Sequence, residues 1–187
     1  MSAFYDPNVI SEIKKELLVL DNNILSSLSG DPDYLTTFMQ IFKANNLLID
    51  PIVRIEFLRG AFKNNAYEEQ KKFLEFEKFN NMMDNQIIQK KVYERVFDIA
   101  RIYSHKGNPS IPLGDIFIIA RLSIYLYNVL FITRDYSDFD SILFDRVGVV
   151  SIERKLKDKV KQATLEHIQI LKFNSSKYNK CMEQLPD

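Results

Sequence analysis

Several apolar, strand-like runs in this chain end at acidic residues. The acids concerned are Asp6, Asp115, Asp135 and Asp138. An α/β fold gathers strand ends at one edge of its sheet, so these carboxylates would repel one another there unless a cation bound between them. The sequence therefore predicts a metal-dependent site.

Strand-like and helix-like patterns alternate along the chain. We expect strands at residues 3–5, 47–49, 76–79, 129–133 and 147–152. Apolar residues at helical spacing predict helices in the stretches 10–18, 31–43, 51–59, 88–106 and 115–128. This alternation favours an α/β fold with a central parallel sheet.

The chain is expected to hold one domain with an added arm. Its 187 residues suffice for one ordinary core and are too few for two full-sized enzyme domains. We expect residues 1–152 to form the α/β domain and residues 153–187 a C-terminal helical extension. Apolar residues from Leu156 to Leu171, with His167 among them, form one face of the expected last helix.

Composition limits which kinds of site are available. Cys181 is the single cysteine, and His105 and His167 are far apart in sequence, which excludes a zinc site of thiolates and imidazoles. Neither histidine has a nearby serine or cysteine that suggests a catalytic triad. A metal ion would therefore be held mainly by oxygen atoms.

Charge and hydropathy set further limits. The formal net charge is zero, from 25 basic and 25 acidic residues, so overall charge does not indicate nucleic-acid binding. The longest apolar region, Ile116 to Thr133, is interrupted by polar residues and does not read as a membrane span. The N-terminus does not resemble a secretion signal. We expect a soluble, globular, cytoplasmic protein.

Four segments resemble, in the right order, the successive signatures of PIN-domain nucleases. They are Phe4 to Ile10, Ile55 to Gly60, Gly107 to Ala120 and Ile132 to Phe139. The likeness is strongest to the VapC-type ribonuclease toxins of bacterial and archaeal toxin-antitoxin pairs, and it covers about residues 2 to 152. It implies a three-layer α/β/α fold whose parallel sheet gathers acidic side chains around Mg²⁺ or Mn²⁺.

The resemblance also implies site residues. The metal-binding and catalytic acids would be Asp6, Glu56, Asp115, and Asp135, Asp138 or both. Asn8 and Thr133 match polar positions that line the same site. The family's first motif usually has Thr or Ser where this chain has Pro7, and the family's typical chain ends near the final strand, whereas this one continues.

Nearby arginines suit a polyanionic substrate. Arg54 and Arg59 flank Glu56, while Arg121 and Arg134 follow other acids, so these guanidinium groups are candidates to bind phosphates. Ion pairing at the surface is the competing interpretation. The basic run at residues 154–161 is typical of the solvated face of an amphipathic helix, with RNA contact as its alternative.

The expected chemistry follows from charge. A phosphodiester and a carboxylate cluster both repel hydroxide, and a hard divalent cation held by oxygen ligands reverses that repulsion. We therefore predict an endoribonuclease that hydrolyses RNA with metal-activated water and acts as the toxin of a toxin-antitoxin pair. The resemblance implies a small antitoxin partner and a homodimer.

Other interpretations of the same residues stay open. Asp6-Pro7-Asn8 is also an ordinary helix start, and Asp115 is also a good helix cap. A catalytically weak or inactive PIN-like module for protein or RNA binding is the main alternative. A phosphoryl-accepting regulatory domain fits less well, because the chain lacks a convincing lysine after a late strand and such a domain would not use Glu56.

Overall fold

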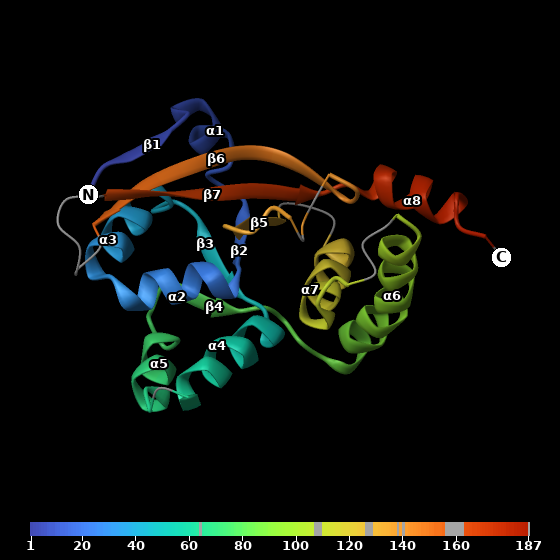
Figure 1. The fold of residues 1–187 in the computed structure, drawn as a ribbon, viewed down its shortest axis with the longest axis horizontal. Helices are drawn as coiled ribbons and strands as arrows, with labels where there is room; N and C mark the ends of the chain where they lie inside the picture. The colour runs from blue at the N-terminus through green and yellow to red at the C-terminus, as the bar shows by residue number, and fades with distance from the viewer. Residues whose placement is uncertain are drawn as a thin grey trace.

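The structure is a computed structural model that describes residues 1–63, 65–106, 110–125, 129–137, 139, 141–155 and 163–186. Its strands form one seven-stranded sheet in the order β1-β6-β7-β5-β2-β3-β4 (Figure 1). The strands are β1 (Ala3–Tyr5), β2 (Leu17–Leu20), β3 (Asn46–Ile49), β4 (Phe79–Asn81), β5 (Val129–Thr133), β6 (Phe144–Lys155) and β7 (Ala163–Phe173).

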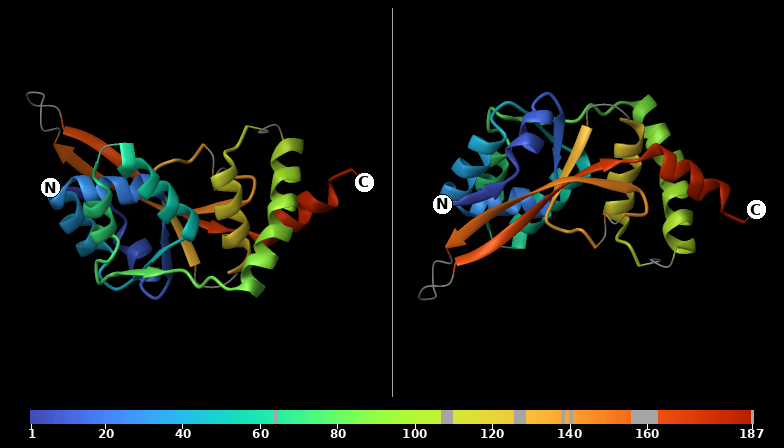
Figure 2. Two further views of the ribbon diagram at one scale, coloured as in Figure 1. Left: turned by 90° about the horizontal axis from the view of Figure 1, so that it is seen from below. Right: turned by 90° about the horizontal axis from the view of Figure 1, so that it is seen from above.

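The helices follow the strands in an α/β arrangement. They are α1 (Pro7–Glu12), α2 (Asn22–Gly30), α3 (Pro32–Ile41), α4 (Pro51–Lys63), α5 (Tyr67–Phe73), α6 (Gln86–His105), α7 (Leu113–Ile124) and α8 (Ser175–Glu183). Helices α2 to α5 gather at the end of the molecule that holds the N-terminus, and α6 to α8 at the end with the C-terminus (Figure 2). Within the described ranges, no helix combines the length and apolarity needed to cross a membrane.

The middle of the sheet is parallel. Strand β2 lies between β5 and β3, with Leu20 opposite Ile132 on one side and Ile49 on the other. The carboxyl ends of these three strands therefore meet at one edge, where α/β proteins place their sites. On the far side of β5 the sheet continues with the antiparallel strands β7, β6 and β1. The α/β class is confirmed, and the sheet is mixed.

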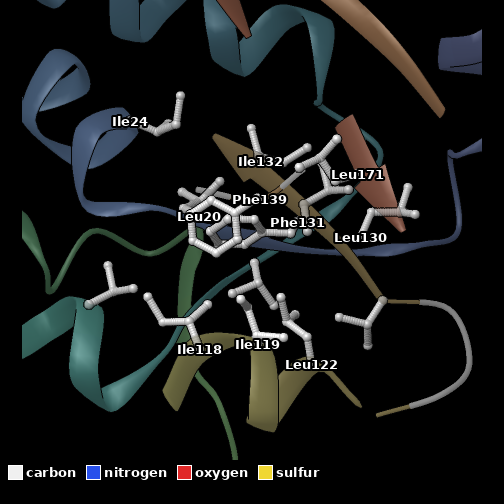
Figure 3. Close-up of a cluster of buried hydrophobic side chains, with 14 of the residues drawn as sticks. Leu20, Ile24, Ile118, Ile119, Leu122, Leu130, Phe131, Ile132, Phe139 and Leu171 are labelled. Atoms are coloured by element: carbon white, nitrogen blue, oxygen red, sulfur yellow. The ribbon is translucent and has the colours of Figure 1, made fainter. Parts of the chain in front are cut away.

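Helices cover both faces of the parallel strands. All five residues of β5 are buried, as expected for a strand covered on both sides. Figure 3 shows Ile24 of α2 on one side of β5 and apolar side chains of α7, including Ile119, on the other. Helix α7 packs against the sheet because nearly every residue from Ile116 to Ser123 is buried.

Strand β2 corrects the helix expected over residues 10–18. Helix α1 ends at Glu12, and Leu17 and Leu18 lie in the centre of the sheet. The spacing of Ile10, Ile13, Leu17 and Leu18 fits a helix, but four successive apolar residues from Leu17 to Leu20 also suit a strand buried on both faces. Pairing with β3 and β5 decides between these patterns.

Strand β7 corrects the C-terminal helix expected from Leu156 to Leu171. Residues 156–162 lie outside the described residues, and from Ala163 onward the chain is a strand between β5 and β6. Ile168 and Ile170 are buried, whereas His167 is exposed and Gln169 is half-buried, which is the alternation of a strand. A C-terminal helix is present, but it is α8 and begins at Ser175.

The other predicted elements are confirmed with shifted ends. The strand expected at 147–152 is part of β6, although it is antiparallel, and the one near 76–79 is β4. Helix α4 runs past Gly60 to Lys63, so this glycine does not end it. Helix α6 ends at His105 beside Lys106, as expected.

Candidate functional site

Asp21 is the central acid at the carboxyl edge of the parallel strands. It follows β2 directly and caps α2, accepting a hydrogen bond from the Asn22 backbone N–H at 2.6 Å. Because Leu20 pairs with Ile132, Asp21 lies beside Thr133 at the end of β5. The Thr133 hydroxyl donates to Asp21 Oδ2 at 2.5 Å. Asp21 is only 6% exposed, so this carboxylate is held in place within the protein.

Asn23 ties the ends of β2 and β5 together. Its side-chain amide donates to Asp21 Oδ2 at 2.6 Å and to Thr133 Oγ1 at 3.1 Å. Its carbonyl oxygen accepts from the Arg134 backbone N–H at 3.1 Å. The Asp135 N–H donates to Thr133 Oγ1 at 3.0 Å, which places Asp135 next to this group. Two loops from distant parts of the sequence are therefore fixed to each other.

Glu56 approaches the same edge from α4 and meets the start of α7. A Cβ atom on Gly114 would lie 2.3 Å from Glu56 Oε1, so only glycine permits this close approach. Asp115 is the next residue, half-buried in the first turn of α7. The helix cap at this terminus is Pro112, which corrects the interpretation of Asp115 as the cap.

Electrostatics link these acids. Burial raises the pKa of the Asp21 carboxyl to about 6, against the lowering effect of hydrogen bonds from Thr133 and Asn22, and the charges of Glu56 and Asp135 raise it further. Burial also raises the pKa of Glu56, and the charge of Arg59 opposes this rise. In the described part of the chain Asp21 forms no ion pair with a basic side chain. Its charge is therefore desolvated and is stabilised by hydrogen bonds alone.

The acids do not form a closed cluster. Among the residues that the structure describes, no three acidic, histidine or cysteine side chains lie close enough together to hold one metal ion. Two carboxylates, Glu56 and Asp135, act electrostatically on Asp21. The arrangement is not a compact set of ligands.

The structure does not bring Asp6 to this edge, which corrects the sequence analysis. Asp6 follows the outermost strand β1 and caps α1 by accepting from the Asn8 N–H at 2.8 Å. Strand β1 lies four positions from β2, about 19 Å at the usual strand spacing. Asp6 and Asn8 are both exposed. The structural interpretation of Asp6-Pro7-Asn8 as a helix start is the correct one.

The remaining predicted residues divide between the edge and elsewhere. Glu56, Asp115, Thr133 and Asp135 lie at the carboxyl edge, and Asp138 lies outside the described residues. Arg134 pairs with Glu166 of β7 at 2.9 Å. Arg59 is exposed, and its charge lowers the pKa of Glu56. Arg121 is buried and paired with Asp50 at 2.7 Å, so the prediction that it binds phosphate is wrong.

Asp21 and Asn23 are the functional candidates that the sequence analysis missed. The signal was present: four apolar residues lead directly to Asp21, and buried residues at helical spacing then follow from Ile24. A strand that ends in an acid and turns into a helix is the same pattern that was assigned to Asp6. Comparisons of this chain with protein-family models, curated proteins and solved structures give no match.

Proposed function

We propose that this protein is a PIN-like endoribonuclease that hydrolyses RNA with Mg²⁺ or Mn²⁺, and that Asp21 is the first acid of its site. The observation that carries the proposal is the buried Asp21 carboxylate, which has no basic partner in the described residues and lies near Glu56 and Asp135. Carboxyl groups with raised pKa values are common at functional sites, so the raised pKa of Asp21 favours a functional role.

The order of residues supports the same proposal. Asp21-Asn22-Asn23 has the acid and asparagine two residues apart that Asp6-Pro7-Asn8 offered, and it still precedes Glu56 and Asp115. The Asn23 side-chain amide donates a hydrogen bond to Asp21, whereas Asn8 donates only its backbone N–H to Asp6. The resemblance to PIN-domain nucleases therefore becomes more consistent when its first motif moves to residues 21–23.

The donor atoms fit a hard divalent cation. Asp21, Glu56, Asp115 and Asp135 offer carboxylate oxygens, which Mg²⁺ and Mn²⁺ prefer. The ion would bind at Asp21, whose carboxylate neighbours are Glu56 and Asp135, and when bound would stabilise charge on the phosphate and make water more acidic. Thr133 and Asn23 keep the Asp21 carboxylate oriented through their hydrogen bonds. Burial is the main cause of the raised pKa of Asp21, and a cation would relieve the additional repulsion from Glu56 and Asp135.

The main alternative is a PIN-like module that binds RNA or protein without cutting. It is favoured by the lack, among the described residues, of three side chains close enough to share an ion. Both versions leave the antitoxin partner and the homodimer as predictions of the resemblance, and the cytoplasmic location as a prediction from the sequence alone.

Cleavage of single-stranded RNA with Mn²⁺ tests the proposal through a matched pair of variants. We expect Asp21→Asn to lower the cleavage rate by about 100-fold, because it removes a charge from the site. Asp6→Asn makes the same chemical change at the other strand-end aspartate and should leave the rate unchanged. The measurement is the single-turnover rate on a labelled RNA, with and without EDTA.

The outcomes separate the candidates. Cleavage that survives in Asp21→Asn would indicate a contaminating nuclease or another site. Loss of activity in Asp6→Asn but not in Asp21→Asn would restore the original assignment. RNA binding without cleavage by the wild-type protein would favour the binding module.

A further inference from the structure

A pocket of about 450 Å³ adjoins the candidate site on the side of β7. It is lined by Asn23, Arg134, Asp135, Glu166 and His167. Asn23 and Asp135 belong to the carboxyl edge already described, whereas Glu166 and His167 come from the antiparallel strand β7. An extended ligand bound over the acids would therefore also contact β7.

His167 is held in a defined position in this pocket wall. It pairs across the β6–β7 ladder with Ser151, and Ser151 Oγ lies 2.8 Å from His167 Nδ1. This pair corrects the expectation that His167 has no serine neighbour and lies on the apolar side of a helix. Across the described residues Nε2 has no hydrogen-bond partner, and the side chain is exposed. Nε2 is therefore the nitrogen offered to a ligand.

His167 lies near the acids as well as in the same pocket. Gln169 pairs with Thr133, and His167 is two residues further along β7, which corresponds to about 7 Å along the strand. A second metal site is not indicated, because no three suitable ligands gather in the described residues.

Arg134 supplies a fixed positive charge to the pocket. Its Nη1 lies 2.9 Å from Glu166 Oε2, and Arg154 Nη1 donates to Glu166 Oε1 at 3.0 Å. Burial opposes ionisation of Glu166, but hydrogen bonds from Arg154 and the charge of Arg134 outweigh it and hold its pKa below the usual range. Glu166 is thus ionised and paired with both guanidinium groups, of which Arg154 also pairs with Asp31 at 3.5 Å. Glu166 orients Arg134 at the pocket wall.

We propose that this pocket binds an RNA phosphate beside the one that lies over the carboxylates, with Arg134 and His167 Nε2–H as donors. The inference rests on the proposed function and adds a substrate-contacting residue from β7. Phosphate is the matching ligand class, because the pocket combines a guanidinium group with a held imidazole donor and is continuous with the acids through Asn23 and Asp135.

The test measures binding of a labelled single-stranded RNA in the Asp21→Asn background, where cleavage is suppressed. At pH 8 we expect His167→Ala to weaken binding by about tenfold, the size of one hydrogen bond to a charged group. The matched control is His105→Ala, at the end of α6, which should bind as before. His167→Gln retains an N–H donor and should recover part of the affinity.

Salt dependence separates the two donors. Arg134→Gln should lower the slope of log affinity against log salt by about 0.7, the value for one phosphate contact on a single strand. His167→Ala should leave this slope unchanged, since it removes a neutral donor. A thermal melt of each variant shows whether it is folded.

Each outcome bears on one proposal or both. If the wild-type protein cleaves RNA but His167→Ala binds as well as His105→Ala, the subsite is overturned and the nuclease stands. If His167→Ala weakens binding but the wild-type protein does not cleave, the subsite stands and the nuclease is overturned. Absence of any RNA binding overturns both.

Discussion

Two buried aspartates end neighbouring parallel strands, and their surroundings differ. Asp21 follows β2 and Asp50 follows β3, and the paired residues Leu20 and Ile49 place them side by side. Asp21 is 6% exposed and Asp50 is 1% exposed. Asp50 Oδ2 lies 2.7 Å from Arg121 Nε, whereas Asp21 lacks a basic partner in the described residues.

A basic partner distinguishes the strand-end acid that supports the fold from the one that is available for chemistry. Burial raises the pKa of Asp50, but the charge of Arg121 and the Ile52 N–H oppose the rise. Arg121 also pairs with Asp84 at 3.1 Å and so joins α7 to the end of β3 and the start of α6. Asp50 therefore has a structural role. Asp21 has the same backbone position without the compensation.

Removal of Arg121 should give the largest change in stability of the variants that test this contrast. Arg121→Met leaves Asp50 buried without its partner, so we expect the free energy of unfolding to fall by about 3–5 kcal/mol. Urea denaturation measures the change. The control is Arg95→Met, which breaks a partly exposed ion pair with Asp98 at 3.6 Å and a cation–π contact with Tyr178, and should cost about 1–2 kcal/mol.

A double variant sharpens the interpretation. Asp50→Asn combined with Arg121→Met removes both charges and should recover part of the lost stability. Equal stability of Arg121→Met and the wild-type protein would mean that Asp50 is not stabilised by this pair.

The second test uses the pH dependence of stability. The pKa of Asp21 rises from 3.8 in the unfolded chain to about 6 in the fold, so the folded state binds more protons between these values. Stability from this group is therefore full below about pH 4 and falls by about 3 kcal/mol as the pH rises past 6. Asp21→Asn should lack this loss.

Urea denaturation at several pH values measures the free energy of unfolding of the wild-type protein and of Asp21→Asn. Glu56 and Asp50 titrate in both proteins, so their contributions largely cancel in the difference. Mn²⁺ at pH 8 should stabilise the wild-type protein and have a smaller effect on Asp21→Asn, because a ligand that binds only the folded state raises its stability. Parallel pH profiles of the two proteins would show that Asp21 is not strained by its charge.

The smallest effect on stability is expected at Gly114. In Gly114→Ala the new Cβ meets the end of the Glu56 side chain, which can move, so stability should change by less than about 1 kcal/mol. Displacement of Glu56 should nevertheless lower RNA cleavage by about tenfold. Gly60→Ala on α4 meets no atom within 4 Å, and should raise stability by about 0.5–1 kcal/mol with unchanged cleavage. Normal cleavage by Gly114→Ala would remove Glu56 from the site.

Local patterns predicted those parts of the fold that local sequence determines. The strands at β3 and β5 are short apolar runs with clear breaks, and α3 begins at Asp31 with Pro32 in its first turn, so their positions were readable. The position of β2 could not be predicted in this way, because Leu17 and Leu18 fit a helical and a strand pattern equally well. Only pairing with β3 and β5, which are distant in sequence, decides between them.

The candidate site was predicted in part for the same reason. Glu56, Asp115 and Asp135 reach the edge from elements whose type was correctly predicted. Asp21 was missed because its importance depends on β2 being a strand, and Asp6 was chosen because β1 is also a strand that ends in an acid. The sheet order that separates these two acids is a property of long-range pairing.

The hydrogen bond between Thr133 and Asp21 joins residues 112 positions apart, and β5 then needs β7 as its other neighbour. A nascent chain that has exposed only its first hundred residues thus holds Asp21 and Glu56 but neither β5 nor β7. Contacts of such long range form late, because the intervening loop must close first. The acids therefore remain without their final partners until β5 and β7 have been synthesised, which delays assembly of the candidate site during translation.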